Sequence, residues 1–213
     1  MYRSDKIFVT GTDTDVGKTV IAAWLCTHWQ ADYWKPIQSG TREGTDSEAV
    51  AQLSPSTTIH EESYVFSEFV SPHLAADLEG EKIDITNIAI PKTSKPLLIE
   101  GAGGLCVPIN DSFLMIDLIA ILKVPVLVVA RSTLGTINHT CLTIQALREK
   151  HIPILGVILN GPFNRSNAQA IEQWGQVPIL AECPLFDPLT KESLQSYPLP
   201  KMLQEIFDVP SIV

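Results

Sequence analysis

The sequence has few cysteines, and none of them stands in a metal-binding arrangement. The four cysteines are widely spaced without a C-x-x-C pair, and the five histidines show no metal-ligand spacing. A structural zinc site is therefore not expected. Two of the thiols fall within apolar segments expected to be helical, so we predict free, buried thiols in a reducing compartment. The four positions are Cys26, Cys106, Cys141 and Cys183.

Long hydrophobic runs are also missing. No apolar stretch approaches the roughly 18 residues of a membrane-spanning helix. The first residues, MYRSDKIFVTG, show no basic region followed by an apolar stretch, so no signal peptide is visible. We therefore expect a soluble, cytoplasmic protein.

Basic residues are in the minority, with 15 Lys and Arg against 24 Asp and Glu, giving a formal net charge of −9. Such a chain is a poor candidate for general binding to nucleic acid or to anionic membranes, which would repel it. Hydrophobic residues make up 45% of the 213 positions. That amount indicates a globular protein with a sizeable core, and we expect one domain over residues 1–213.

The most informative segment is residues 7–20, IFVTGTDTDVGKTV. An apolar strand leads into a loop between Gly11 and Gly17, and Lys18 and Thr19 then open a helix. This order is typical of a phosphate-binding loop, in which backbone N–H groups, the helix dipole and the Lys face the anion while the Thr hydroxyl can bind Mg²⁺. The two glycines enclose five residues instead of the usual four. A plain Gly-rich turn is the alternative, but it leaves Lys18 and Thr19 unexplained.

Short apolar strands alternate with longer amphipathic helices along most of the chain. Continuous apolar strands between helices predict an α/β fold of the P-loop NTPase type, with a mostly parallel sheet covered by helices on both faces. The expected strands are 7–9, 33–37, 97–99, 124–130, 154–159 and 177–181. The expected helices are 20–30, 46–53, 113–122, 137–150, 165–174 and 199–207. Residues 54–95 are hard to interpret, with a possible strand at 64–66 and a possible helix and loop within 74–90.

Polar residues follow several of the expected strands. Lys18, Lys35, Glu100 and Asn160 each stand just past an apolar strand. Ligands of open parallel sheets bind at the carboxyl ends of the strands. We therefore expect these four residues to gather at one edge of the sheet.

A magnesium site is expected beside the phosphate loop. Mg²⁺ bound with a nucleotide usually takes one or two carboxylates in addition to phosphate oxygens. Thr19 would supply a hydroxyl, and Asp46 and Glu100 are the candidate carboxylates. Simple N-capping is the alternative for Asp46, and a surface charge at a strand end is the alternative for Glu100.

Two further segments carry candidate ligand contacts. In WKPIQSG, residues 34–40, Lys35 and Ser39 offer a cation and a hydroxyl to an anionic group, although a lone Lys is ordinarily a solvated charge. In TLGTINH, residues 133–139, Gly135 and Asn138 could form a polar loop at a helix start. A plain N-cap explains Asn138 nearly as well.

The motifs GTDTDVGKT, KPIQSG, SPH, EGAGG and TLGTINH, in this order, closely resemble those of the dethiobiotin synthetase family. The five-residue gap in the phosphate loop is typical of that family. The same loop also occurs in cobyrinate amide-forming synthetases and in some phosphotransacetylases, so the combination with KPxxSG and EGAGG is the specific signal. The resemblance covers about residues 7–185.

This resemblance implies a ligase of biotin biosynthesis. The family uses CO₂, ATP and Mg²⁺ to close a ureido ring on 7,8-diaminononanoate, forming dethiobiotin, ADP and phosphate through a carbamate and a carbamic-phosphoric anhydride. Lys35 and Lys18 would stabilise the carbamate and the transferring phosphoryl group. Mg²⁺ would lie among Thr19, Asp46 and Glu100.

The remaining implied contacts concern ATP, the diamine and a second subunit. Asn160 would read the adenine edge in a pocket formed with residues 183–185, and Ser39 would touch the diamine. In a homodimer, Gly135 and Asn138 would reach the substrate carboxylate of the partner subunit. The residues expected to contact ATP are Thr14, Asp15, Val16, Gly17, Lys18, Thr19, Val20, Asp46, Glu100, Gly101, Ala102, Gly103, Asn160, Gly161, Cys183, Pro184 and Leu185.

The chain departs from the family pattern at two of these positions. Asp15 stands where Glu is common, which the backbone-dominated binding of the loop should tolerate. Gly161 follows Asn160 where Asp is frequent, so the contact to the base is less well defined.

Two alternative functions differ from this one in recognisable sequence features. A ParA/MinD-like switch ATPase usually has an extra Lys early in its phosphate loop, and residues 11–15 contain none. A cobyrinate-type synthetase carries a glutaminase domain, for which 213 residues leave no room.

Overall fold

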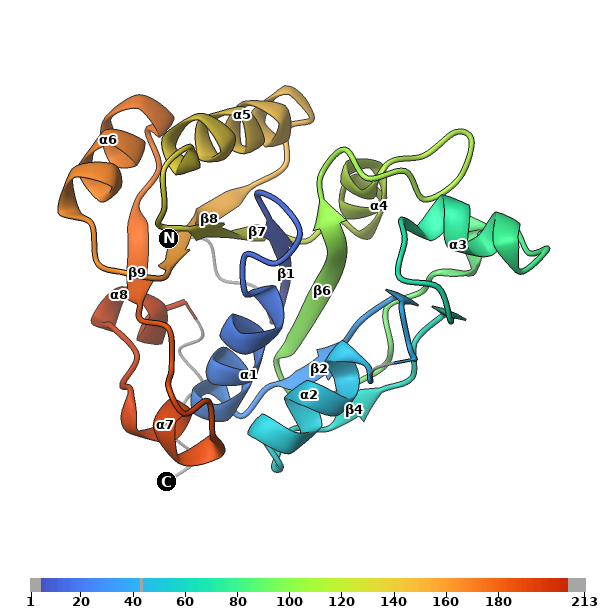
Figure 1. Ribbon diagram of the computed structural model, residues 1–213, viewed down its shortest axis with the longest axis horizontal. Coiled ribbons are helices and arrows are strands. Elements are labelled where there is room, and N and C mark those ends of the chain that lie inside the picture. Colours follow the sequence, from blue (N-terminus) through green and yellow to red (C-terminus); the bar gives the residue numbers. More distant parts are fainter. Residues whose placement is uncertain (1–4, 43, 207–213) are drawn as a thin grey trace.

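The computed structural model describes residues 5–42 and 44–206, and its main element is a seven-stranded sheet. All neighbouring strands are parallel, in the order β4-β2-β6-β1-β7-β8-β9, as Figure 1 shows. The predicted α/β fold with a parallel sheet is therefore confirmed. The strands are β1 (Lys6–Gly11), β2 (Asp32–Trp34), β4 (Ile59–His60), β6 (Leu97–Gly104), β7 (Val126–Arg131), β8 (Ile154–Asn160) and β9 (Ile179–Cys183).

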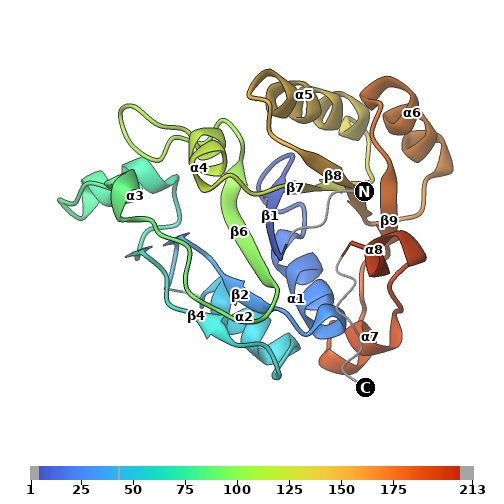
Figure 2. The ribbon, with the colours of Figure 1, turned by 180° about the vertical axis from the view of Figure 1, so that it is seen from behind.

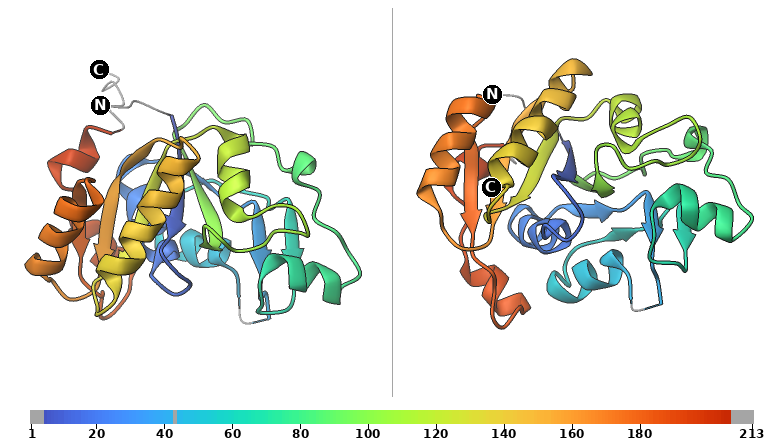
Figure 3. Two further views of the ribbon diagram at one scale, coloured as in Figure 1. Left: turned by 90° about the horizontal axis from the view of Figure 1, so that it is seen from above. Right: turned by 45° about the horizontal axis from the view of Figure 1, so that its top comes forward.

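Helices cover both faces of this sheet, which the right-hand view of Figure 3 shows as two layers. Helices α1, α2, α7 and α8 contribute to the hydrophobic core on one face, and α3, α4, α5 and α6 contribute to the core on the other. Their bounds are α1 (Lys18–Trp29), α2 (Asp46–Leu53), α3 (Pro72–Leu78), α4 (Met115–Leu122), α5 (Thr136–Glu149), α6 (Arg165–Gly175), α7 (Lys191–Ser196) and α8 (Lys201–Gln204). A short 3₁₀ helix spans Ile85–Asn87.

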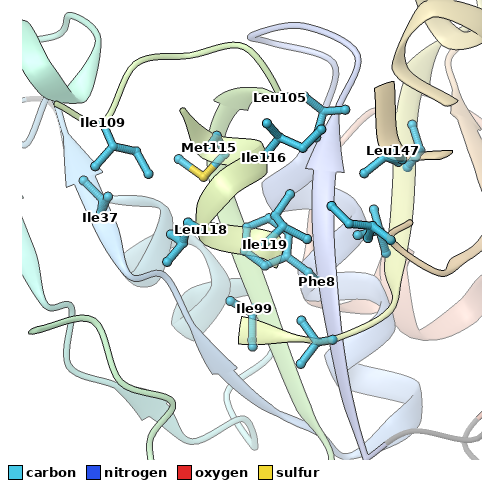
Figure 4. Packing of buried hydrophobic residues seen from close by; sticks show 14 of the residues in the cluster. Phe8, Ile37, Ile99, Leu105, Ile109, Met115, Ile116, Leu118, Ile119 and Leu147 are labelled. Atoms are coloured by element: carbon cyan, nitrogen blue, oxygen red, sulfur yellow. The ribbon is translucent and has the colours of Figure 1, made fainter. Parts of the chain in front are cut away.

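The central strand β1 shows how the two cores arise from one sequence pattern. Ile7 and Val9 belong to the core under α1, whereas Phe8 belongs to the opposite core, because successive side chains of a strand point to opposite faces. Figure 4 shows Phe8 close to Ile119 of α4 in this second core. Burying each such side chain contributes about 1.5–3 kcal/mol to stability, so β1 is held from both sides and supports the loop at its end.

A second, two-stranded sheet lies beside α3, at the end of the molecule where Figure 2 shows this helix. It pairs β3 (Ile37–Ser39) with β5 (Tyr64–Phe66) in parallel. The predicted strand 33–37 was wrong in its extent, since Lys35 and Pro36 separate β2 from β3. Pro36 has no N–H to donate to a ladder, and its carbonyl instead accepts the N–H groups of Ser63 and Tyr64 at 2.9 and 3.1 Å.

Several predicted elements match, and others differ. The helix 46–53 and the strand 64–66 agree with α2 and β5. The terminal helix predicted at 199–207 is shorter, since α8 spans only Lys201–Gln204, and residue 207 lies outside the described residues. Helix α7 was not predicted. No helix among residues 5–42 and 44–206 combines the length and the apolar character needed to cross a membrane.

The prediction of four free thiols agrees with the structure, but burial holds for only two of them. Cys26 and Cys183 are buried, Cys141 is half-buried and Cys106 is exposed. Cys106 was mispredicted because it lies in the turn that follows β6, where the chain leaves the sheet.

Candidate nucleotide and metal site

A cavity of about 850 Å³ opens at the carboxyl ends of the central strands. Five segments that are distant in sequence line it, and each comes from a strand end or a helix start. They lie within residues 14–20, 35–40, 44–52, 69–72 and 100–107. This position follows the rule that parallel α/β sheets bind ligands beyond the carboxyl ends of their strands.

The loop between β1 and α1 has the backbone of an anion-binding site. Gly17 precedes α1 with φ +91°, and a Cβ there would lie 2.0 Å from Nδ2 of Asn160. Asp15 also adopts a left-handed conformation, with φ 54°. No side chain in the described part of the chain caps the start of α1. Its first N–H groups therefore remain available to a phosphate.

Lys18 lies along this loop, largely buried. Its Nζ is 3.3 Å from the carbonyl oxygen of Asp13. Burial lowers the pKa of Lys18, although the nearby carboxylates, chiefly that of Glu100, act in the opposite direction. A phosphate group bound here would supply the counter-charge that favours the protonated ammonium.

Thr19, Asp46 and Glu100 come together at the other side of the loop. The Thr19 hydroxyl Oγ1 is 2.6 Å from Oδ1 of Asp46 and 3.0 Å from Oε1 of Glu100. A hydroxyl carries one proton, so it can satisfy only one of these carboxylate oxygens at a time. The cluster therefore has more acceptors than donors, which is the arrangement that a cation would complete.

Lys35 reaches the same two carboxylates from the segment between β2 and β3. Its Nζ lies 2.5 Å from Oδ2 of Asp46 and 3.3 Å from Oε1 of Glu100, and the residue is only 3% exposed. Burial alone would lower the pKa of Lys35, but the charges of Glu100 and Asp46 and their hydrogen bonds outweigh burial and raise it. The ammonium is thus held charged inside the cavity.

The structure decides between the alternatives for these three residues. Asp46 does not cap α2, because Thr45 occupies the cap and forms a reciprocal capping box with Glu48. Glu100 was expected just past its strand, but β6 continues to Gly104 and Glu100 is 1% exposed within it, so a surface charge is excluded. Lys35 is likewise not a solvated charge. Lys35 and Glu100 are buried where only a paired charge is stable, and Asp46 is half-buried beside them.

The donor set at this point suits Mg²⁺. Carboxylate and hydroxyl oxygens are the ligands that this hard cation prefers, with phosphate oxygens and water completing its shell. Burial raises the pKa of Asp46, but the charge of Lys35 and its hydrogen bond outweigh burial and lower it. The Asp46 carboxylate therefore stays ionised, as a metal ligand must be.

The segments around Ser39 and the EGAGG motif also reach the cavity. Ser39 lines it, and its buried hydroxyl has no hydrogen-bond partner among the described residues. Ala102 and Gly103 line the wall, whereas Gly101 packs on the core, since a Cβ there would lie 2.7 Å from the ring of Phe8. A small residue is thus needed at position 101 for core packing, whereas Gly103 forms part of the cavity wall.

The residues expected at the base lie at the ends of β8 and β9, outside the lining of this cavity. Asn160 donates from Nδ2 to the carbonyl oxygen of Val16 at 3.1 Å and so tethers the phosphate loop. Gly161 donates its N–H to the carbonyl of Cys183. The Cys183 thiol faces the core, where burial raises its pKa to about 12, while Leu185 is 68% exposed.

Gly135 and Asn138 lie at the start of α5, also outside the cavity lining. Gly135 is the N-cap of this helix, with φ +94°, so the capping role considered for Asn138 is wrong. Both residues are exposed. Their side of the molecule is open to solvent or to another chain.

Two residues that were not predicted from the sequence form hydrogen bonds to the carboxylate residues of the site. The Tyr33 hydroxyl donates to Oε2 of Glu100 at 2.9 Å, and Gln38 accepts the backbone N–H of Asp46 at 3.1 Å. Tyr33 lies outside the sequence motifs, and Gln38 lies within KPIQSG without being a predicted contact. Their roles depend on the pairing of β2 with β6 and on the path of the loop before α2.

A parallel α/β sheet with a phosphate loop, a buried lysine pair and a Thr–Asp–Glu cluster defines a P-loop nucleotide-binding protein. Solved structures agree on the fold. A nucleotide-binding protein in complex with ADP from Archaeoglobus fulgidus matches with a TM-score of 0.54 at 13% identity, covering 95% of this chain and 91% of that one. Chloroplast FtsY from Physcomitrella patens matches with a TM-score of 0.50 at 13% identity, covering 91% of this chain and 66% of that one.

Sequence comparison is more specific. A family model described as an AAA domain matches residues 5–193. The ATP-dependent dethiobiotin synthetase BioD of Paramagnetospirillum magneticum is 52% identical over 91% of this chain and 95% of its own length. The enzyme of the same name from Lawsonia intracellularis is 49% identical over 96% of this chain and 100% of its own. The chain therefore belongs to the dethiobiotin synthetase family.

Proposed function

We propose that this protein is an ATP-dependent cyclo-ligase that converts 7,8-diaminononanoate and CO₂ into dethiobiotin, with ADP and phosphate as the other products. The single observation that carries this proposal is the convergence of Lys18, Lys35, Thr19, Asp46 and Glu100 on one cavity beside the phosphate loop. A hydrolase or switch would need the loop and the metal ligands. A second buried lysine beside the carboxylates suits a reaction that also passes through an anionic carbamate.

The chemistry requires two anions to meet. One amine of the substrate adds to CO₂ and loses a proton, which gives a carbamate. A carbamate oxygen then attacks the γ-phosphorus of ATP and ADP leaves. The second amine attacks the carbonyl carbon of the resulting anhydride, phosphate leaves, and the cyclic urea forms. Lys35 and Lys18 would neutralise the carbamate and the transferring phosphoryl group, since positioning and charge stabilisation dominate phosphoryl transfer.

Thr19, Asp46 and Glu100 would hold Mg²⁺, which supplies charge neutralisation of the phosphate oxygens when bound. In the present structure the Lys35 ammonium takes part of that role, because it contacts both carboxylates. Lys35 would turn toward the substrate anion once a metal satisfies Asp46 and Glu100. Its long, flexible side chain permits this change without movement of the backbone.

ATP would lie along the loop from Thr14 to Val20, with its base toward the ends of β8 and β9. Asn160 is well placed for the base because it already adjoins the loop through Val16. Gly161, Pro184 and the backbone of Cys183 would form the rest of the base pocket. Leu185, exposed here, would cover the base.

The diamine would occupy the cavity opposite the phosphate loop. Ser39 supports this placement, because its buried hydroxyl is left without a partner by the described residues. Gly135 and Asn138 are exposed and do not line the cavity of their own chain. We therefore propose that they act across a homodimer, on the substrate carboxylate bound to the partner subunit.

One assay tests the proposal. Phosphate release from ATP is expected only when Mg²⁺, bicarbonate and 7,8-diaminononanoate are present together, and dropping any one should abolish it. Release that is indifferent to the diamine, or that DNA or lipid vesicles stimulate instead, would overturn the proposal in favour of a switch ATPase.

A further inference from the structure

Glu100 uses its two carboxylate oxygens for different purposes. Oε1 faces the cavity, 3.0 Å from Oγ1 of Thr19 and 3.3 Å from Nζ of Lys35. Oε2 points away from the cavity and accepts the Tyr33 hydroxyl at 2.9 Å. Within residues 5–42 and 44–206, the Tyr33 phenol is the one hydrogen-bond donor to Oε2.

The sheet explains why Tyr33 can reach this oxygen. Tyr33 of β2 pairs with Leu98 of β6, and Leu98 and Glu100 point to the same face because strand side chains alternate. Tyr33 and Leu98 share the core under α1, and Tyr33 is fully buried there. Its ring is held by that packing, so the direction of its O–H is set by the fold. Asp46, by contrast, starts a helix at the solvent side of the cavity.

We propose that Tyr33 is a positioning residue for the metal site. It binds Oε2 and thereby fixes the rotation of the Glu100 carboxylate, so that Oε1 is presented to Mg²⁺. Without the phenol, the carboxylate can turn Oε2 toward Lys35 and Thr19, and the ligand oxygen loses its fixed direction. This inference rests on the metal site of the proposed function and adds a residue that does not line the cavity.

The test measures metal binding directly, without turnover. Mn²⁺ affinity is measured by electron paramagnetic resonance in the presence of ADP, and ADP affinity is measured by calorimetry without metal. Tyr33→Phe keeps the ring and removes only the hydroxyl. Loss of an outer hydrogen bond to a metal ligand typically costs about 10- to 100-fold in metal affinity, and we expect that loss for Mn²⁺, with metal-free ADP binding changed less than about twofold.

The matched control is Tyr197→Phe, which removes a phenol hydrogen bond to the carbonyl oxygen of Glu182; neither residue lines the cavity. It should leave Mn²⁺ affinity unchanged. A Tyr33→Phe protein that binds Mn²⁺ like the unaltered chain would overturn the inference. If the unaltered protein itself bound Mn²⁺ no better with ADP than without it, the proposed function would fail instead.

A double variant separates positioning from folding. Glu100→Gln keeps the size of the side chain but replaces the charged carboxylate by a neutral amide. In a Glu100→Gln background, adding Tyr33→Phe should change Mn²⁺ affinity by less than about twofold, since the carboxylate on which Tyr33 acts is gone. A further large loss in the double variant would contradict action through Glu100.

Discussion

Replacing Lys35 by Met would remove the cation shared by the buried carboxylate of Glu100 and the half-buried carboxylate of Asp46, while keeping most of the apolar side chain. The Lys35 Nζ lies 2.5 Å from Oδ2 of Asp46 and 3.3 Å from Oε1 of Glu100. Removing one partner of a buried ion pair costs about 3–5 kcal/mol, because the remaining charge stays buried without compensation. The metal-free Lys35→Met protein should therefore be less stable by that amount.

The loss of stability should be measurable by thermal unfolding. One kcal/mol shifts the Tm of a domain of this size by about 2–4 °C, so a decrease of about 6–20 °C is expected without metal. Mg²⁺ with ADP should recover much of the decrease, because the proposed metal would supply the missing positive charge to Asp46 and Glu100. Calorimetric scans with and without Mg²⁺ and ADP test both parts.

Turnover should respond differently from nucleotide binding. Removing one preorganised charge-stabilising group from an active site typically lowers kcat by about 10²- to 10³-fold. We expect a fall of that size for Lys35→Met in phosphate release with Mg²⁺, bicarbonate and the diamine, while ADP binding largely survives. The control is Lys95→Met, which removes a half-exposed cation 3.4 Å from Oδ1 of Asp32 and should cost less than about 1 kcal/mol.

Two results would refute this reasoning. Undiminished turnover in Lys35→Met would show that the ammonium has no part in the reaction. Loss of nucleotide binding with turnover per bound ATP preserved would assign Lys35 to ATP rather than to the carbamate.

Three further changes give distinct outcomes. Lys18→Met should weaken ADP binding and lower kcat together, in calorimetry and phosphate release, because this lysine would contact the phosphates of the bound nucleotide. Gly17→Ala should abolish nucleotide binding, since Gly17 has φ +91° and the added Cβ would clash with the Asn160 amide. ADP affinity within twofold of that of the unaltered chain would contradict the loop geometry. For Asp32, burial alone would raise the pKa, but hydrogen bonds from Thr93 and other neighbours lower it. Its stabilisation should therefore be present at pH 7 and lost below about pH 4. Asp32→Asn should cost about 1–3 kcal/mol in urea unfolding at pH 7, and the difference should close at lower pH.

The sheet and the phosphate loop were predictable because their signals are local. Short, β-branched apolar runs such as 124–130 and 154–159 between helical segments are typical of buried strands, and the spacing of Gly17, Lys18 and Thr19 predicts a strand-loop-helix turn. Residues 54–95 were not predictable to the same degree. They form short strands and turns whose pairing partners, such as β3 for β5, lie far away in sequence.

The candidate site was predictable in its members but not in its internal contacts. Lys35 and Glu100 stood near strand ends, and the parallel sheet brings such positions together. Nothing local showed that β6 continues past Glu100 or that Lys35 contacts two carboxylates. Tyr33 was missed for a similar reason. Its place in a buried strand is evident from the sequence, but the hydrogen bond from its hydroxyl to a carboxylate of the neighbouring strand is not.

Isotope transfer tests the central claim most directly. If a substrate carbamate attacks the γ-phosphorus, one oxygen that entered with CO₂ leaves with the phosphate. A single turnover with ¹⁸O-labelled bicarbonate, stopped before exchange with water, should therefore give phosphate carrying one ¹⁸O, together with dethiobiotin. Unlabelled phosphate would show that water attacks ATP, and it would contradict the account of this cavity as a carbamate-phosphorylating site.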